Sequence, residues 1–383
     1  MLSTRPRILH MTRNLPPLVG GMERLNWHIA DELANYADVH VMGPDGSYNS
    51  KPKQVQLSEI SLRPLWKFLL LAKIYGVFLA KKFKPDIVLA GSGLMAPAAL
   101  FAARITGARA CVYVHGLDVA VMHPIYRALW HPAIRHMDAV IANSLPTAEL
   151  AQEIGVNPKK INIVHPGVDI PKSRQAMAAL QAFRLQHGLG NARILLSIGR
   201  LTTRKGLREF VLEALPAIVK VEPHTLLVVI GDAPSDALRA GAQSRESIQA
   251  AAATVGVSQN LRFLGVVTDP IELALAYESA ELHVFPVRTL PGDPEGFGMV
   301  AIEAAAHGLP TVAFASGGVI EAVANERSGV LVPPGDYPAF AQAVLNVLAA
   351  DKAVFSRSAS DFAKEFAWPE FGSKLFPLLQ NQI

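Results

Sequence analysis

The feature that most constrains the fold of this chain is a regular alternation of short, strand-like apolar runs with segments of helical length. In the first part of the sequence the expected strands are 8–11, 39–42, 87–90, 110–114 and 139–142, and the expected helices are 23–36, 64–82 and 97–106. Parallel strands need a crossover connection between them, and a helix is the usual one. The alternation therefore predicts a parallel sheet with helices on both of its faces.

A second series of the same kind follows a different stretch of sequence. Residues 157–192 carry turn signals and a polar helical segment, which predicts a connection between domains. The expected strands of the second series are 194–198, 226–230, 262–264, 282–285, 311–314 and 329–332. A chain of 383 residues also exceeds what one hydrophobic core usually organises. We therefore predict an α/β protein with two Rossmann-like, doubly wound domains, 1–175 and 176–361, that face a central cleft.

The composition, 50% hydrophobic and 18% charged, is typical of a well-packed globular enzyme. Cys111 is the single cysteine, so no internal disulfide is expected and a reducing compartment is favoured. The sequence does not open with a secretory signal. The uncharged run Ile87–Ala103 is short for a membrane span and is interrupted by glycines and by Pro97. We predict a cytoplasmic protein without a transmembrane helix.

The net charge of +4 hides an asymmetry between the two halves. Residues 1–175 hold 20 Lys and Arg against 12 Asp and Glu, whereas the remainder holds 16 against 20. A basic half of this kind suits an anionic membrane or nucleic acid. Because the sequence contains no recognisable element for reading bases, we do not expect a nucleic-acid partner.

One segment carries most of the chemical information. Glu295 opens the glycine-rich loop Gly296, Phe297 and Gly298, and Glu303 lies in the helix that this loop begins. Free N–H groups at a helix start can receive a phosphate. A carboxylate accepts two directional hydrogen bonds at once and so suits sugar hydroxyls. The segment predicts a binding site for a phosphorylated sugar, and a solvent-exposed pair of glutamates is the alternative.

Two glutamates eight residues apart in this setting, followed by the turn Ala315–Gly318, resemble the EX7E motif of glycosyltransferase family 4. The chain is similar to bacterial mannosyltransferases of the phosphatidylinositol mannosyltransferase type. The resemblance implies the GT-B fold and a retaining transfer from a nucleotide diphosphate sugar. It also implies that Glu303 binds the nucleotide ribose and that Glu295 binds the transferred sugar or its phosphate side.

A second motif supplies positive charge. Arg200 follows an expected strand, and Lys205 precedes an expected helix. A guanidinium offers a bidentate fork and an ammonium offers a point charge, a combination that suits a diphosphate leaving group. A basic pair at a helix start is usually solvated surface, but the nearby glutamate motif favours a binding site. In the family, the matching residues neutralise the departing diphosphate.

Many sugar transferases hold Mg²⁺ or Mn²⁺ on the diphosphate with an Asp-x-Asp motif, which does not occur in this sequence. With Arg200 and Lys205 present, its absence suggests that the protein itself supplies the positive charge. We therefore expect a metal-independent enzyme with no cofactor, for which the nucleotide sugar is a substrate.

The first half carries two weaker signals. Gly20 and Gly21 lie between the first expected strand and helix, where the backbone can approach a ligand and the helix start favours an anion. His115 and Asp118 follow an expected strand, and Asp118 also suits a helix cap. Both segments resemble family motifs that contact the donor phosphate or acceptor and the sugar. The residues assigned to catalysis are His115, Arg200, Lys205 and Glu295.

Three further segments have both a functional and a structural interpretation. Asn143 and Ser144 either contact the acceptor or cap a helix, and 165–169 resembles a structural interdomain segment of the family. The C-terminal stretch 362–383 resembles the family's last segment, which returns to the N-terminal domain. An ordinary amphipathic tail is the alternative.

The sequence indicates the donor only weakly. The loop 287–294 resembles a loop of family mannosyltransferases that use GDP-mannose, so mannose from GDP-mannose is favoured and a UDP-sugar remains open. The family's retaining chemistry is usually explained by a front-face substitution, in which the leaving phosphate helps to deprotonate the acceptor hydroxyl.

The acceptor is indicated by residues 61–85, which contain six Lys and Arg and no acidic residue. Apolar residues recur there at helical spacing, and Trp66 and Phe78 lie outside the main stripe. A basic amphipathic helix of this kind suits an anionic membrane surface and a glycan or lipid-linked acceptor. A core-packed helix with a solvated basic face is the alternative.

Other functions fit the motifs less well. A sugar phosphorylase needs a lysine for pyridoxal phosphate, and none stands out. A hydrolase with Glu295 and Glu303 as its carboxylate pair leaves Arg200 and Lys205 without a role. A dehydrogenase is disfavoured because no Gly-x-Gly-x-x-Gly follows the first strand. A non-catalytic sugar-binding or scaffold protein remains the rival of a different class.

Overall fold

The computed structural model describes residues 5–233 and 241–380 and divides the chain into two units. Unit 1 is Met1–Gly167 together with Trp368–Ile383, and unit 2 is Val168–Ala367. The first boundary therefore lies before the expected 175/176, and the return to unit 1 begins after the expected residue 362.

The positions of both boundaries have a common structural reason. Val168 forms a parallel β-bridge with Ala367, and its N–H donates to the carbonyl of Phe366 at 2.8 Å. The chain thus enters and leaves unit 2 through two segments that are hydrogen-bonded to each other. Residues 168–175 and 362–367 belong to unit 2, whereas they were expected in the first domain.

The described residues of unit 1 form one parallel sheet of seven strands, in the order β3-β2-β1-β4-β5-β6-β7. The strands are β1 (Arg7–Met11), β2 (Asp38–Pro44), β3 (Gln56–Ile60), β4 (Ile87–Ala90), β5 (Arg109–Val114), β6 (Ala139–Ala142) and β7 (Ile161–Ile163). The helices are α1 (Gly21–Leu33), α2 (Leu65–Phe83), α3 (Ala96–Thr106), α4 (Leu117–Ala120), α5 (Pro124–Arg135), α6 (Leu145–Glu153) and α16 (Trp368–Gln380).

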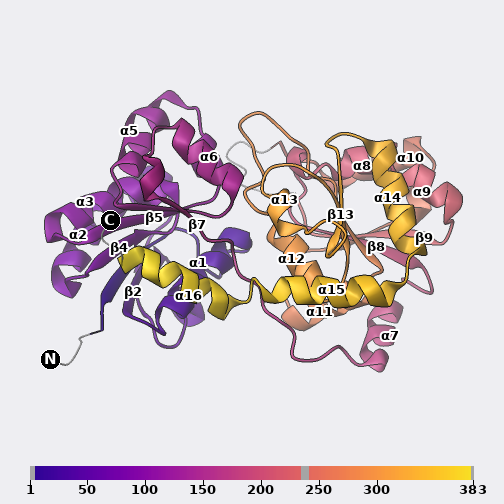
Figure 1. The fold of residues 1–383 in the computed structure, drawn as a ribbon, viewed down its shortest axis with the longest axis horizontal. Helices are drawn as coiled ribbons and strands as arrows, with labels where there is room; N and C mark the ends of the chain where they lie inside the picture. Colours follow the sequence, from indigo (N-terminus) through magenta and orange to yellow (C-terminus); the bar gives the residue numbers. More distant parts are fainter. Residues whose placement is uncertain (1–4, 234–240, 381–383) are drawn as a thin grey trace. The chain divides into compact units, whose positions relative to one another are not determined.

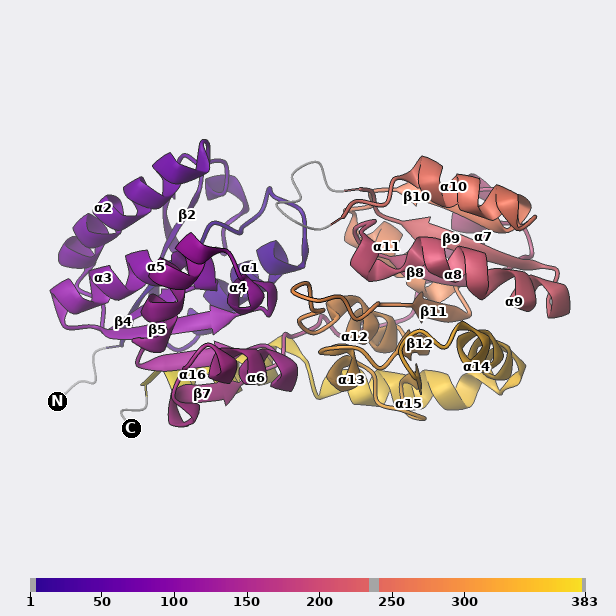
Figure 2. The same ribbon diagram turned by 90° about the horizontal axis from the view of Figure 1, so that it is seen from above.

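Alternate residues of the unit 1 strands face opposite layers of helices, as the two-residue period of a strand requires. Leu9 and Met11 belong to a core that also contains Phe68 of α2 and residues of α3 and α5. Tyr113 faces the other layer, where its ring lies 6.2 Å from that of Phe371 in α16. Figure 2 shows α2, α3 and α5 together on one side of the sheet. The α16 helix, drawn in yellow in Figure 1, packs against α1.

The described residues of unit 2 form a parallel sheet of six strands, in the order β10-β9-β8-β11-β12-β13. The strands are β8 (Arg193–Ile198), β9 (Thr225–Ile230), β10 (Leu261–Gly265), β11 (Leu282–Phe285), β12 (Thr311–Phe314) and β13 (Gly329–Val332). The helices are α7 (Met177–Gln186), α8 (Leu207–Glu213), α9 (Leu215–Val221), α10 (Arg245–Thr254), α11 (Pro270–Ser279), α12 (Met299–Ala306), α13 (Val319–Ala322), α14 (Tyr337–Ala349) and α15 (Lys352–Lys364).

Unit 2 also buries both faces of its sheet. On one face, Leu195, Leu227 and Phe314 pack with α8, α9, α10 and α14. On the other, Ile194 and Leu226 pack with α7, α11 and α12. Each fully buried large apolar side chain contributes about 1.5–3 kcal/mol. The two units are thus the two doubly wound, Rossmann-like domains that the alternation predicts.

Two strands were missed in the sequence. The β3 strand, Gln56–Ile60, is polar and pairs only with β2 at an edge, so it lacks a continuous apolar run. The β7 strand has three residues and lies inside the stretch 157–192 that was expected to be a connection. The predicted connection therefore starts with the last strand of the first sheet.

None of the helices in the described part of the chain is both long and apolar enough to cross a membrane.

Candidate functional site

Each sheet has one point at which its strand order reverses, and loops on either side of such a point leave a crevice at the carboxyl ends of the strands. In unit 2 this point lies between the neighbouring strands β8 and β11. Arg200 and Lys205 follow β8, and Glu295 lies in the loop between β11 and α12. Glu303 lies in α12 itself. The switch point of unit 2 thus brings together four of the predicted donor-site residues: Arg200, Lys205, Glu295 and Glu303.

Lys205 and Glu295 are in direct contact. The Lys205 ammonium donates to Glu295 Oε2 at 2.8 Å, and their side chains are only 17% and 11% exposed. The ammonium also lies over the ring of Phe285, 4.6 Å from its centroid. Lys205 reaches this position from a short 3-10 turn, Thr203–Lys205, which Gly206 ends with a φ of 67°. A Cβ at Gly206 would lie 2.2 Å from the carbonyl oxygen of Pro286, so only glycine fits this turn.

A third charged residue, Arg204, completes the cluster and was not singled out in the sequence. Its guanidinium bonds to Glu295 and, at 3.1 Å, to Oδ1 of Asp293. Arg204 is buried, which is unusual for arginine unless it is paired. The sequence signal was its position directly before Lys205 in a loop that follows a strand.

Burial and like charge shape the electrostatics of this cluster. Desolvation lowers the pKa of Lys205 well below its usual value, and the nearby Arg204 and Arg200 lower it further. Desolvation also lowers the pKa of Arg204. Arg200, Arg204 and Lys205 thus lie close enough to repel one another, with Asp293 and Glu295 as the nearby carboxylates. An anionic ligand would reduce this repulsion.

The loop that carries Glu295 is held by glycine contacts. Gly318 N donates to the carbonyl of Glu295 at 2.9 Å, and a Cβ at Gly318 would lie 2.1 Å from the carbonyl oxygen of Gly296. Gly317 approaches the carbonyl of Glu295 in the same way. The turn Ala315–Gly318, noted in the sequence beside the glutamate motif, therefore works as the support of the Glu295 loop.

The α12 helix positions Glu303 and offers an anion-binding end. Gly298, with a φ of 97°, is its N-cap, and the first-turn N–H groups of a helix have no acceptor within the helix. Glu303 is the fifth residue of α12, and its carboxylate accepts a hydrogen bond from the Tyr277 hydroxyl at 2.9 Å. The Tyr277 ring stacks on His307, with centroids 5.1 Å apart. Tyr277 was missed because it comes from α11, distant in sequence.

Unit 1 has a switch point of its own, between β1 and β4, and its predicted residues follow strands at or next to this point. Gly20 and Gly21 begin α1 after β1. His115 follows β5, and its Nε2 lies 2.8 Å from the carbonyl oxygen of Gly91 after β4. Asp118 accepts from the backbone N–H groups of His115 at 2.8 Å and Gly93 at 2.7 Å. Asp118 therefore ties two loops together, where the sequence suggested a helix cap.

The flanking predictions have clear structural roles. Ser144 is the N-cap of α6, and its hydroxyl accepts from the N–H of Thr147 at 3.3 Å. Gly167, in the expected structural segment 165–169, lies so close to Trp368 that a Cβ would be 2.2 Å from the indole ring. The described residues include no cluster of three or more His, Cys, Asp or Glu that could hold a metal ion.

Both units match models of known protein families. Residues 19–172 match the family model described as Glycosyltransferase Family 4, and residues 192–350 match that of Glycosyl transferases group 1. A GDP-mannose-dependent alpha-(1-6)-phosphatidylinositol monomannoside mannosyltransferase of Mycolicibacterium smegmatis is 30% identical over 308 residues, which are 78% of this chain and 77% of the relative.

A D-inositol 3-phosphate glycosyltransferase of Segniliparus rotundus is 32% identical over 239 residues, or 61% of this chain. That alignment spans only 50% of the relative, so the match covers about half of that protein's length.

Solved structures share the fold at lower identity. Anabaena HepE in complex with UDP superposes with a TM-score of 0.80 at 20% identity, covering 97% of this chain and 99% of the other. A glycosyltransferase from Rickettsia africae gives a TM-score of 0.78 at 21% identity, covering 99% and 100%. With the two family models and the mycobacterial relative, the likeness is consistent over both units, and the chain belongs to glycosyltransferase family 4.

Proposed function

We propose that the protein is a retaining, metal-independent glycosyltransferase that moves a hexose from a nucleotide diphosphate sugar to a glycan or lipid-linked acceptor. The observation that carries this proposal is the contact between Lys205 and Glu295 at the switch point of unit 2, beside the N-terminus of α12. A buried cation, a carboxylate and free helix N–H groups together match a sugar diphosphate.

The proposed chemistry follows from the charges of the cluster. The bond between the sugar's anomeric carbon and the diphosphate oxygen breaks, and the acceptor oxygen forms the new bond on the same face. The acceptor's proton passes to the departing phosphate. Arg200 and Lys205 stabilise the negative charge that develops on the diphosphate, a type of stabilisation that is stronger in a water-poor site. Glu295 holds Lys205 in place and accepts from sugar hydroxyls, while Glu303 accepts from the ribose.

Mannose from GDP-mannose is the donor we favour. The loop 287–294 and the relative named as a GDP-mannose-dependent mannosyltransferase both support it. A UDP-sugar is the second candidate, supported by the structural likeness to HepE, which was solved with UDP-glucose. In either case the positive charge needed at the diphosphate comes from Arg200, Arg204 and Lys205 and requires no metal.

The acceptor side of the proposal rests on α2. Four apolar side chains recur every fourth residue along this helix and are 51–69% exposed: Trp66, Leu70, Ile74 and Phe78. Phe68, Ala72 and Leu79 of the same helix are buried, so the exposed stripe is additional to the face that packs on the sheet. Six basic residues and no acidic one occupy 61–85. We infer a cytoplasmic protein that lies against the anionic inner face of a membrane, where a lipid-linked acceptor is within reach.

The donor site is tested by thermal stabilisation with GDP, UDP and ADP in the presence of EDTA, because ligands that bind only the folded state raise its apparent stability. We expect one nucleotide to stabilise the wild type. Glu303→Ala should weaken the binding of that nucleotide by about 10- to 100-fold, because the variant loses a hydrogen bond to a charged group.

The matched control is Glu246→Ala, a fully exposed glutamate in the first turn of α10, which should respond like the wild type. Stabilisation that appears only with Mg²⁺ would refute the metal-independent mechanism. If Glu303→Ala and wild type respond equally, the donor site is assigned wrongly.

A further inference from the structure

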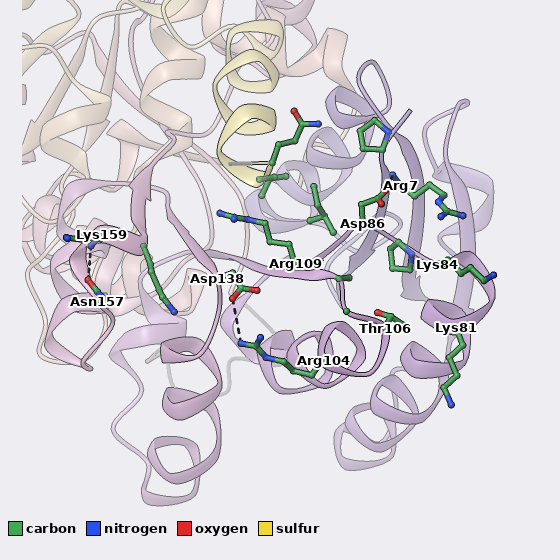
Figure 3. Close-up of a pocket in the computed structure, with 18 residues that line it drawn as sticks. Arg7, Lys81, Lys84, Asp86, Arg104, Thr106, Arg109, Asp138, Asn157 and Lys159 are labelled. Carbon is green, nitrogen blue, oxygen red and sulfur yellow. Dashed lines mark hydrogen bonds and ion pairs between the residues drawn. The ribbon is translucent and has the colours of Figure 1, made fainter. Parts of the chain in front are cut away.

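A large pocket lies in unit 1 at the edge of the sheet opposite to the switch-point loops. Its volume is about 1170 Å³, and it is lined by residues at the amino ends of the strands, including Arg7, Ile87 and Arg109, and by the C-terminal ends of α2 and α3. We call it the amino-edge pocket (Figure 3). Because all strands of this sheet are parallel, the pocket is a full strand length away from the cluster that contains His115.

The lining of the amino-edge pocket is strongly basic. Its cationic residues are Arg7, Lys81, Lys84, Arg104, Arg109, Lys159 and Lys160, and its acidic residues are Asp86 and Asp138. The lining therefore carries a formal surplus of five positive charges, from seven cations and two carboxylates. Such a concentration in a concave surface attracts anions more strongly than the same charges spread over a flat one.

Both carboxylates already have backbone partners. Asp86 Oδ2 accepts from the N–H of Arg7 at 2.8 Å, and Asp138 Oδ2 accepts from the N–H of Ala110 at 2.8 Å. Each aspartate thus accepts from an N–H group at the start of a neighbouring strand, the first residue of β1 and the second of β5. Asp138 also lies 3.6 Å from Arg104, whose side chain is 58% exposed. The two carboxylates therefore bind backbone N–H groups at the starts of strands, and most of the positive charge of the lining remains uncompensated.

Most of the cations have no acidic partner. Within the described residues, the side chains of Lys81, Lys84 and Lys159 form no hydrogen bond or ion pair, and the Nε atom of Arg109 is buried without a hydrogen-bond acceptor. Arg109 lies near the middle of the labelled residues in Figure 3. The ammonium groups of these three lysines are therefore free to bind an anion in the pocket.

Helix dipoles explain only part of this arrangement. Lysines and arginines are favoured at helix C-termini, which accounts for Lys81 and Lys84 at the end of α2 and for Arg104 in α3. Lys159 likewise lies in the last turn of a short 3-10 helix, Pro158–Lys160, whereas Arg109 begins a strand and has no helix end to complement. The place of Arg109 in this basic lining needs another reason.

We propose that the amino-edge pocket binds a phosphate-bearing anion, supplied by a soluble phosphate compound or by the headgroup of an anionic lipid. Phosphate oxygens accept from several cationic donors at once, and Arg109 with the surrounding lysines offers such donors around one cavity. This site is separate from the donor site of unit 2 and does not depend on the proposed transferase activity.

The soluble form of the ligand is tested with inorganic pyrophosphate and hydrogen-exchange mass spectrometry on the full chain. We expect slower exchange in the segments 81–86, 104–110 and 157–161, an effect that sodium chloride weakens because the lysines are solvent-facing. Any pyrophosphate bound in unit 2 would protect other segments, so the two sites are read independently. No protection of these three segments by pyrophosphate, and none by the vesicles described below, would overturn the proposal.

The contributions of the side chains are tested with paired variants. Lys84→Gln with Lys159→Gln removes two pocket charges, and Lys53→Gln with Lys220→Gln removes two exposed charges outside the pocket. We expect the first pair to bind pyrophosphate about tenfold more weakly and the second to bind like the wild type. Equal affinities of the two pairs would refute the assignment.

Vesicles distinguish the two sources of the phosphate. If the source is a lipid headgroup, phosphatidylcholine vesicles with phosphatidic acid will protect the same segments, and pyrophosphate will compete. If the source is soluble, pyrophosphate alone will protect them. Either result supports the pocket as an anion site, whereas protection by neutral phosphatidylcholine vesicles that equals protection by phosphatidic acid would contradict it.

Discussion

The loss of the single residue Glu295 would remove an ionic partner from two cations at once. Its carboxylate forms ion pairs with both Lys205 and Arg204, and all three side chains are at most 17% exposed. Removing one partner of a buried ion pair leaves a buried charge without compensation, which typically costs about 3–5 kcal/mol.

We therefore predict that Glu295→Gln destabilises unit 2 by about 3 kcal/mol or more in urea unfolding. The matched control is Glu365→Gln, which breaks an ion pair with Arg327 whose side chains are 55% and 56% exposed. Such a surface pair contributes about 0–1 kcal/mol. Similar losses in both variants would show that the Glu295 cluster is not an interdependent buried network.

A buried histidine predicts an acid-sensitive step in unit 1. His10 in β1 is fully buried, and desolvation lowers its pKa from 6.5 to about 4. As the pH falls below 6.5 the unfolded chain takes up a proton and the folded one does not, so stability falls until the pH reaches about 4. This group alone should remove about 2 kcal/mol between pH 7.5 and pH 5.

His10→Leu should abolish this share of the pH dependence, so its unfolding free energy should change by about 2 kcal/mol less over the same interval than that of the wild type. Chemical denaturation at the two pH values measures the difference. The exposed His224 provides the control, since His224→Gln should follow the wild type. An unchanged pH dependence in His10→Leu would assign the acid sensitivity to other groups.

Among the structural elements, the turn before α13 determines where the Glu295 loop lies. Gly318 has an ordinary helical φ of −69°, so an alanine there is not strained by its own backbone. Its Cβ, however, would lie 2.1 Å from the carbonyl oxygen of Gly296, and that atom belongs to backbone that cannot rotate away. The substitution must displace one of the two loops.

We predict that Gly318→Ala abolishes nucleotide-induced stabilisation, because the displaced loop carries both Glu295 and the start of α12. Gly292→Ala is the control in the same loop: its φ of 72° costs about 1–2 kcal/mol, but no atom lies within 4 Å of the added Cβ. Nucleotide titration by thermal shift compares the two. Normal binding by Gly318→Ala would mean that the loop adapts without loss of the site.

The exposed stripe of α2 allows a test that leaves every charge in place. Trp66 and Phe78 are 69% and 57% exposed, so replacing both with serine removes apolar area without disturbing the core. We expect Trp66→Ser with Phe78→Ser to lose most of its sedimentation with anionic vesicles, because buried apolar area strengthens interfacial binding.

Met177 and Leu185 of α7 provide the control for this prediction, since they are 69% and 84% exposed but lie in unit 2. Met177→Ser with Leu185→Ser should sediment like the wild type. If the two pairs behave alike, the membrane surface does not involve α2.

At the scale of the whole molecule, the last helix belongs to the first domain. Trp368 starts α16 and stacks on His28 of α1, with ring centroids 3.8 Å apart. Gly167 lies against the same indole, so the end of the chain packs on the segment at which unit 1 first ended. Truncating a large buried aromatic residue typically costs about 3–5 kcal/mol.

Trp368→Ala should therefore accelerate hydrogen exchange throughout unit 1 and leave the peptides of 177–349 unchanged. Phe376→Ala is the control on the same helix: Phe376 is half-buried, stacks on Tyr36 at 4.9 Å and should have a smaller effect. Equal acceleration in unit 2 would show that the two units unfold as one.

Much of the fold was accessible from the sequence because it depends on local periodicity. The apolar runs 87–90, 139–142 and 282–285 correspond to β4, β6 and β11 residue for residue. Buried parallel strands need apolar residues on both faces, so each produces a continuous run. Edge strands do not, which is why β3 and β7 were missed.

The sequence by itself determined the two-domain α/β architecture and predicted a donor site at Arg200, Lys205, Glu295 and Glu303, because spacing after a strand is a local property. Only the tertiary structure decided which of them touch, since Glu295 meets Lys205 across 90 residues and Tyr277 reaches Glu303 from another helix. The amino-edge pocket is likewise a tertiary feature. Its cations come from strand starts and helix ends that only the parallel sheet brings to one edge.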